Sequence, residues 1–259
     1  MKRNRDIKKV VRAQYADTIS RDDFSTASRE RRHDSVAYAE SIGYSQQEIK
    51  SVPEGAAVTH GCGNPTAIAE LKEGETVLDL GCGGGLDAFL AAQRVGSRGK
   101  VIGLDMTAEM VEKARTNARA GNYANVEFRA AEIEKLPLAD SSVDVVMSNC
   151  VINHSTDKLT VFKEAYRVLK PGGRLFVSDL VTVSRLSDDV RWNAHKLWTE
   201  WLSVACDKRE YLNAIESAGF AAVAVLAEGL FPLSEADEVL KGRITSLQVK
   251  ALKIGKTMA

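Results

Sequence analysis

The chain has 259 residues, of which 44% are hydrophobic and 27% are charged, which is the ordinary composition of a globular protein. A chain of this length can bury a core without disulfides or structural metal ions. Its formal net charge of zero at pH 7 gives no electrostatic reason to expect nucleic acid or an anionic membrane as a partner.

The first 60 residues are predicted to form an N-terminal helical extension. Ile7, Val10, Val11 and Tyr15 recur near helical spacing, which predicts an amphipathic helix over residues 5–15. The polar segment 16–35 suits either an exposed surface segment or a lid over a pocket. The N-terminus lacks the apolar region of a signal peptide, and no apolar run approaches the roughly 20 residues of a membrane span, so we expect a cytoplasmic protein.

Residues 61–183 are predicted to form the core domain. Short apolar segments alternate there with segments of helical pattern, which is typical of a parallel sheet with helices on both faces. The predicted strands cover 76–80, 101–105, 126–129, 143–148 and 174–179, with helices after the first, second and fourth of them and a turn over 170–173. We therefore predict an α/β fold with a Rossmann-like, mostly parallel sheet.

Residues 184–259 are predicted to form a helical insertion on the substrate side, followed by the final strands. The segment 184–206 carries three tryptophans and would cover the pocket as a helix. Asp207 is a suitable cap for a further helix, which Gly219 ends. Residues 223–227 and 246–252 suit a pair of antiparallel edge strands.

The strongest local signal is Asp-Leu-Gly-Cys-Gly-Gly-Gly over residues 79–85, between a predicted strand and a helix. Ligands of open parallel sheets bind at the carboxyl ends of the strands, where glycines let the backbone approach them closely. Asp105 ends the second strand, where a carboxylate can accept hydrogen bonds from both ribose hydroxyls. A nicotinamide cofactor remains an alternative, although Leu86 stands where its fingerprint requires the third glycine.

Three motifs occur in order along the chain: the glycine motif over 79–85, Gly-Leu-Asp-Met over 103–106 and Arg-Val-Leu-Lys-Pro-Gly-Gly-Arg over 167–174. In these motifs and in their order the chain resembles the class I S-adenosylmethionine methyltransferases. The resemblance covers about residues 50–225 and implies S-adenosylmethionine as the cofactor. It implies that the glycine loop holds the methionine end of the cofactor and that Asp105 holds the ribose. The cofactor contacts that it implies are Asp79, Gly81, Gly83, Asp105, Met106, Glu132, Ile133 and Asn149.

Two cysteine segments, Gly-Cys-Gly-Asn-Pro over 61–65 and Ser-Asn-Cys-Val-Ile-Asn over 148–153, narrow this resemblance to the arsenite methyltransferases. In that family thiolates at these two positions bind trivalent arsenic, a soft and thiophilic element, which implies this role for Cys62 and Cys150. The implied reaction moves a methyl group to thiol-bound arsenite or methylarsonous acid. A thiol reductant, glutathione or thioredoxin, would then be a partner.

The chain departs from the family at one further cysteine position, which Trp201 occupies here. A site with two thiolates would suit a monomethylated arsenic better than inorganic arsenite. Cys206 lies nearby but is displaced along its helix, and we expect Cys82 and Cys206 to be packing residues, as buried free cysteines usually are. The spacing of the four cysteines does not favour a zinc site.

Two other functions remain open for this sequence. The chain could be a methyltransferase that acts on a small organic acceptor, in which case Cys62 and Cys150 would be dispensable. It could also be a non-catalytic protein that binds a metalloid or the cofactor. No DNA-reading motif is present in the sequence to support a transcriptional sensor.

Overall fold

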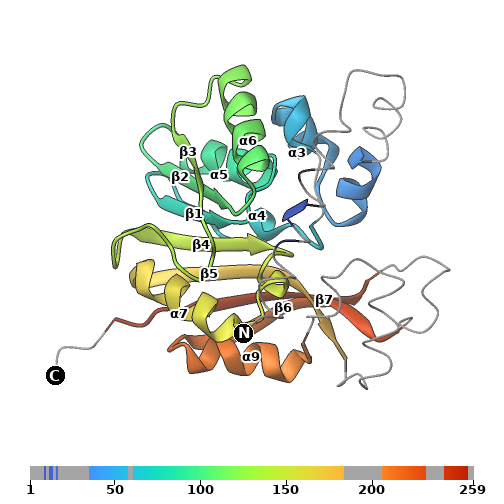
Figure 1. The fold of residues 1–259 in the computed structure, drawn as a ribbon, viewed down its shortest axis with the longest axis vertical. Helices are drawn as coiled ribbons and strands as arrows, with labels where there is room; N and C mark the ends of the chain where they lie inside the picture. The colour runs from blue at the N-terminus through green and yellow to red at the C-terminus, as the bar shows by residue number, and fades with distance from the viewer. Residues whose placement is uncertain are drawn as a thin grey trace.

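The computed structural model describes residues 9, 12, 13, 16, 35–57, 61–183, 206–231 and 242–255. They contain a seven-stranded sheet of order β3-β2-β1-β4-β5-β7-β6 (Figure 1). The strands are β1 (Thr76–Leu80), β2 (Lys100–Asp105), β3 (Val126–Ala130), β4 (Val143–Asn149), β5 (Leu169–Thr182), β6 (Ala221–Leu230) and β7 (Ile244–Leu252). The first five strands are parallel and β7 is antiparallel to both β5 and β6, which confirms the predicted fold class and the antiparallel final pair.

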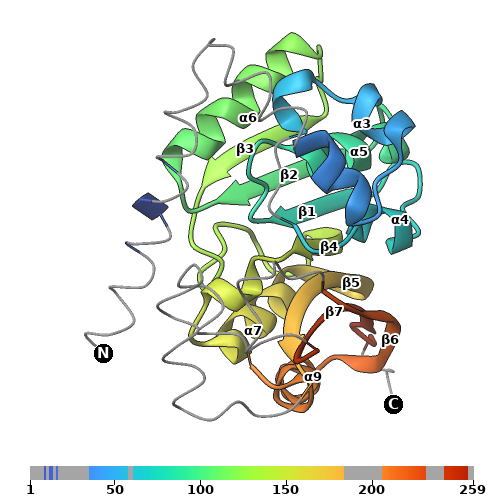
Figure 2. The same ribbon diagram turned by 90° about the vertical axis from the view of Figure 1, so that its right-hand side faces the viewer.

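Helices cover both faces of the sheet (Figure 2). One apolar cluster joins α3 (Gln46–Ser51), α5 (Leu86–Val95) and α6 (Ala108–Ala120) to one face, with α4 (Pro65–Ile68) against α5. The other cluster joins α7 (Lys158–Val168) and α9 (Lys208–Ser217) to the opposite face. Successive strand residues point to opposite faces, so Val77 packs in the first cluster and Leu78 in the second. The 3-10 turns are η1 (Glu54–Ala56) and η2 (Ile152–His154).

The order of the strands reverses at β1, whose neighbours are β2 on one side and β4 on the other. The connections that leave the carboxyl ends of β1 and β4 therefore turn to opposite faces and leave a crevice between them. This is the edge of the sheet at which the sequence predicts the ligand.

The turn predicted over residues 170–173 is wrong, because β5 continues through this segment. Val143 pairs with Leu169 and Val145 with Arg174, so the four intervening residues form a bulge opposite Asp144. Gly172 adopts a φ of +81°, and its N–H donates to the carbonyl of Lys253 at 2.7 Å. The Pro-Gly-Gly sequence thus bends a long strand and does not end it.

Part of the prediction falls outside the described residues. Of the helix expected over 5–15, residues 9, 12 and 13 are described, and they are helical. The insertion with Trp192, Trp198 and Trp201 lies outside the described ranges, as does the segment 16–35 except at residues 16 and 35. The division of the chain at 60/61 and 183/184 stays a prediction.

No helix within the described residues is both long enough and apolar enough to cross a bilayer.

Candidate functional site

The glycine turn connects β1 to α5 through a backbone that only glycine adopts easily. Gly81, Gly83 and Gly85 have φ values of +72°, +51° and +101°. The N–H of Gly81 donates to the carbonyl of Leu104 at 2.7 Å, which fixes the turn against the end of β2. A Cβ atom on Gly81 would lie 2.2 Å from Cγ2 of Val151, whereas a Cβ atom on Gly83 would meet nothing within 4 Å.

A cavity opens beside this turn at the carboxyl ends of β1, β2 and β4. It is lined by residues from the glycine turn, from the end of β2, from the segment after β3 and from the end of β4. Of the predicted cofactor contacts, Gly81, Gly83, Asp105, Met106, Glu132, Ile133 and Asn149 line the cavity, and so does Cys150. Asp79 is the predicted contact that does not line it.

The cavity is acidic. Its described lining contains four carboxylates and neither lysine nor arginine; the acids are Asp87, Asp105, Glu132 and Glu134. Arg12 is a nearby cation, 3.6 Å from Glu132. Such a lining favours a cationic ligand and disfavours a pyrophosphate.

Three carboxyl groups around the glycine turn have raised pKa values, and burial is the largest cause for each. Burial raises the pKa of Asp87 to about 6. Burial raises the pKa of Asp105 although two backbone hydrogen bonds lower it. Its Oδ2 accepts from the N–H of Gly83 at 3.0 Å, and its Oδ1 accepts from the N–H of Thr107 at 2.8 Å. The pKa of Asp79 is raised further, by burial and then by the charges of Asp87 and Asp105. Its Oδ2 has no hydrogen-bond partner among the described residues, so a positive charge at the turn would relieve all three acids.

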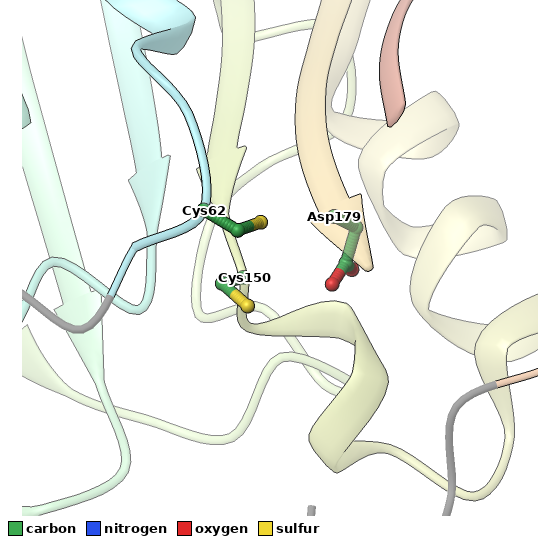
Figure 3. Close-up of side chains that lie close together, drawn as sticks. All are labelled: Cys62, Cys150 and Asp179. Atoms are coloured by element: carbon green, nitrogen blue, oxygen red, sulfur yellow. The ribbon is translucent and has the colours of Figure 1, made fainter. Parts of the chain in front are cut away.

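The two thiols predicted to act together do lie together, although they are far apart in the sequence. The sulfur atoms of Cys62 and Cys150 and one carboxylate oxygen of Asp179 lie within 4.8 Å of one another, and all three residues are buried (Figure 3). Cys150 follows β4 with a φ of +59°, a strained conformation for a residue with a side chain. Because Cys150 also lines the cavity, the thiol cluster adjoins it. Cys206 and Cys82 are buried outside this cluster.

Burial and neighbouring acid groups dominate the electrostatics of the cluster. Burial raises the pKa of Cys62 well above its usual range, and the adjacent Cys150 and Asp179 raise it further. Burial also raises the pKa of Asp179 to about 7, against the positive charge of Lys158 and the hydrogen bond from Tyr211. Sequence reasoning missed Asp179. The available signal was its position at the end of the predicted strand 174–179, because parallel strands present their polar side chains at their carboxyl ends.

The loop that carries Cys62 is held by the side chain of Asn149. The backbone N–H of Cys62 donates to Oδ1 of Asn149 at 2.9 Å, and Nδ2 of Asn149 donates to the carbonyl of Gly63 at 2.7 Å. The same Nδ2 lies 2.9 Å from the hydroxyl oxygen of Tyr44, which itself donates to Asp87 at 2.7 Å. Asn149 was expected to contact the cofactor, and in the structure its amide joins the thiol loop to the wall of the cavity.

Two further hydroxyl groups, which the sequence did not reveal, hold the same loop. Tyr38 donates to the carbonyl of Gly61 at 2.7 Å, and Ser246 donates to the carbonyl of Cys62 at 2.5 Å. They come from a helix near the N-terminus and from β7, so the position of Cys62 depends on three distant parts of the chain.

A family model described as a methyltransferase domain matches residues 71–219, which is more than half of the chain. The chain is 48% identical over 187 residues to an arsenite methyltransferase of Halobacterium salinarum, covering 72% of this chain and 48% of that protein. It is 36% identical over 226 residues to the human arsenite methyltransferase, covering 82% of this chain and 59% of the relative. The chain thus spans about half the length of these curated relatives.

Among solved structures, the chain is similar to an arsenic(III) S-adenosylmethionine methyltransferase from Chlamydomonas reinhardtii. The TM-score is 0.69 and the identity 35%, and the match covers 86% of this chain and 74% of that chain. A putative methyltransferase from Bacillus halodurans has the same fold, with a TM-score of 0.61 at 24% identity.

The glycine turn predicts unequal costs for two alanine substitutions. Gly81→Ala and Gly83→Ala each place a side chain at positive φ, at a cost of about 1–2 kcal/mol. Gly81→Ala also overlaps Val151, which adds about 1–3 kcal/mol. Urea unfolding should therefore show the larger loss for Gly81→Ala, and adding Val151→Ala should recover much of the difference. Equal losses for the two variants would contradict this account of the turn.

The loop contacts predict that Asn149→Ala releases the Cys62 loop. The variant leaves two backbone groups of the loop without partners and should lose about 2 kcal/mol or more of unfolding free energy. Alkylation of Cys62, followed by peptide mass spectrometry, should be faster than in the parent. Asn125→Ala is the matched control, because the amide of Asn125 also bonds two backbone groups, the carbonyls of Ala92 and Gly96, but far from the thiols. A comparable acceleration in the control would show that general destabilisation exposes Cys62.

Proposed function

Because the chain belongs to the methyltransferase domain family, we propose that it transfers a methyl group from S-adenosylmethionine to trivalent arsenic bound by Cys62 and Cys150. The observation that carries this proposal is the buried thiol pair at the wall of the acidic cavity. The names of the curated relatives and of the solved Chlamydomonas structure support the same activity. This chain spans about half the length of those curated relatives, so their activity is proposed for it and is not taken over from them.

The cavity fits S-adenosylmethionine on two observations. The glycine turn leaves open space at Gly83, where a side chain would otherwise stand against a ligand. Burial raises the pKa values of Asp79, Asp87 and Asp105, and the ammonium and sulfonium groups of this cofactor would stabilise their charged forms. The same acids would repel the pyrophosphate of a nicotinamide cofactor, which argues against a dehydrogenase.

When bound, the cofactor supplies an electrophilic methyl group on its sulfonium. We assign the glycine turn to its methionine end, with the buried Asp79 behind the turn acting through its charge, Asp105 to its ribose, and Glu132 and Ile133 to its adenine. Met106 would pack at the same wall of the cavity. The contribution of the protein is to hold the acceptor in line with the methyl group and to exclude water.

The thiol pair suits trivalent arsenic because soft sulfur ligands bind it better than carboxylates or imidazoles do. Each thiol replaces one hydroxyl of the acceptor: its proton leaves with that hydroxyl as water, and an As–S bond takes the place of the As–O bond. The arsenic keeps its lone pair, which is the nucleophile toward the methyl group. Cys150 lines the cavity, so its arsenic would face the cofactor directly.

The proposal predicts that methyl transfer requires both thiols. With labelled S-adenosylmethionine, excess thiol and arsenite or methylarsonous acid, the parent protein should transfer label to arsenic. Cys62→Ser and Cys150→Ser should abolish transfer without abolishing cofactor binding, since serine is a poor ligand for arsenic. Cys206→Ser is the control, because Cys206 is a buried thiol outside the cluster, and this variant should keep the activity.

Two other results would replace the proposal. Transfer to an organic acceptor that survives both serine substitutions would identify a different methyltransferase. Cofactor binding without transfer to any acceptor would indicate a binding protein.

We also propose that a thiol reductant of the glutathione or thioredoxin class supports this activity. The sulfur atoms of Cys62 and Cys150 are close enough that a small movement would allow a disulfide, which cannot bind arsenic. Treatment with diamide, which takes two electrons and two protons from the pair, should abolish arsenite binding, and excess thiol should restore it. Cys206→Ser should behave as the parent does, and arsenite binding that survives oxidation of both site thiols would contradict the proposal.

A further inference from the structure

A third side chain faces the two thiols, and the activity proposed above has not used it. Asp179 lies near the carboxyl end of β5, is 1% exposed, and turns its carboxyl group toward the same space as the sulfur atoms of Cys62 and Cys150 (Figure 3). Its neighbours in this cluster are therefore the two sulfur atoms.

The carboxyl group is held firmly by three donors. Oδ1 accepts from Nδ2 of Asn153 at 2.6 Å and from the N–H of Leu180 at 3.0 Å. Oδ2 accepts from the hydroxyl of Tyr211 at 3.0 Å. Tyr211 is fully buried and packs edge to face on Phe162, with ring centroids 5.4 Å apart.

This arrangement leaves capacity on one oxygen. A carboxylate oxygen accepts about two hydrogen bonds, so among the described residues Oδ1 has its full number of donors and Oδ2 has one acceptor position left. The neighbourhood contains other buried polar atoms without partners among the described residues, including Oδ1 of Asn153 and Oγ of Ser178. The site therefore has hydrogen-bonding capacity that the described part of the protein does not use, which suits a ligand with hydroxyl groups.

The two arsenic acceptors differ in whether a hydroxyl group remains on arsenic after both thiols have bound it. Arsenite reacts as As(OH)₃ with two thiols to give a bis-thiolate that retains one As–OH group, with two waters released. Methylarsonous acid, CH₃As(OH)₂, also releases two waters but retains no hydroxyl. Only the bound form of arsenite can thus donate a hydrogen bond from its third position.

We propose, on the basis of the arsenic function above, that Asp179 is a specificity-determining residue that accepts this third As–OH group and favours inorganic arsenite. Tyr211 and Asn153 are its positioning residues. With sulfur ligands alone, a two-thiol site would favour methylated arsenic, which is the preference that the sequence predicts. Asp179 provides what this two-thiol site lacks. Where a third thiolate would bind arsenic directly, the carboxyl oxygen accepts a hydrogen bond from the As–OH group.

The test compares the affinities for the two acceptors, measured by calorimetry on the full chain without cofactor and under anaerobic conditions. Asp179→Asn removes the carboxylate acceptor, so the variant should bind arsenite about 10-fold or more weakly than the parent does. Binding of methylarsonous acid should change much less, because that bound form has no hydroxyl to donate. Asp144→Asn is the matched control: Asp144 bonds Lys170 and the N–H of Thr76 at the other end of β4, and both affinities should stay unchanged.

A second variant keeps the test decisive if Asp179→Asn fails to fold. Asp179→Cys puts a third thiol in the cluster and should tighten arsenite binding. X-ray absorption at arsenic should then change from two sulfurs and one oxygen in the parent to three sulfurs. Equal losses for both acceptors, or no change for either, would overturn the role of Asp179, as would an arsenic that keeps one oxygen in Asp179→Cys. Failure of the parent to bind either acceptor would instead refute the arsenic function itself.

Discussion

The amide of Asn149 is the interaction on which the geometry of the site depends. The end of β4 carries both this amide and Cys150, and the amide holds the backbone on either side of Cys62. One side chain therefore sets the separation of two thiols that lie 88 positions apart in the chain. Through Tyr44 and Asp87 the same amide is joined to α5, the helix that begins at the glycine turn. A substitution of Asn149 would therefore alter both the thiol cluster and the wall of the cavity.

The two parts of the site have different electrostatic character, and this difference separates their ligands. The cavity gathers carboxylates around a turn of backbone N–H groups and suits a cation, whereas the thiol cluster is buried and suits a neutral, thiophilic acceptor. Cys150, which has a positive φ, belongs to both parts: it lines the cavity and it is a member of the thiol cluster. A strained backbone conformation of this kind persists only where surrounding contacts hold it. Here the N–H of Cys150 donates a hydrogen bond to the carbonyl of Ser178.

The features that the sequence predicted well are those written in short, local patterns. The strands β1 to β4, the glycine turn and Asp105 follow from apolar runs, glycines and spacing, and the structure places them within one residue or so of the prediction. Cys62 and Cys150 came from resemblance and not from any local rule. Asp179 was overlooked although it ends a predicted strand, whereas Tyr38 and Ser246 were missed because their roles exist only after folding: Ser246 bonds a residue 184 positions away. The turn predicted over 170–173 failed because the strand bulges at these residues and pairs with β4 on both sides of them, while Gly172 and Gly173 bond to the backbone of Lys253.

Several buried polar atoms that have no partner among the described residues lie at the same edge of the sheet. Native proteins pair nearly all buried polar groups, and each unpaired group costs about 1–3 kcal/mol. In the described part of the chain, such atoms include Oδ2 of Asp79, Oδ1 of Asn153, Oγ of Ser178 and Oγ1 of Thr182, all at or near the carboxyl ends of β1, β4 and β5. A core built from the two apolar clusters can tolerate these costs. Ligands that satisfy the atoms would return the energy as binding, so the ligands that fit this site should also stabilise the fold.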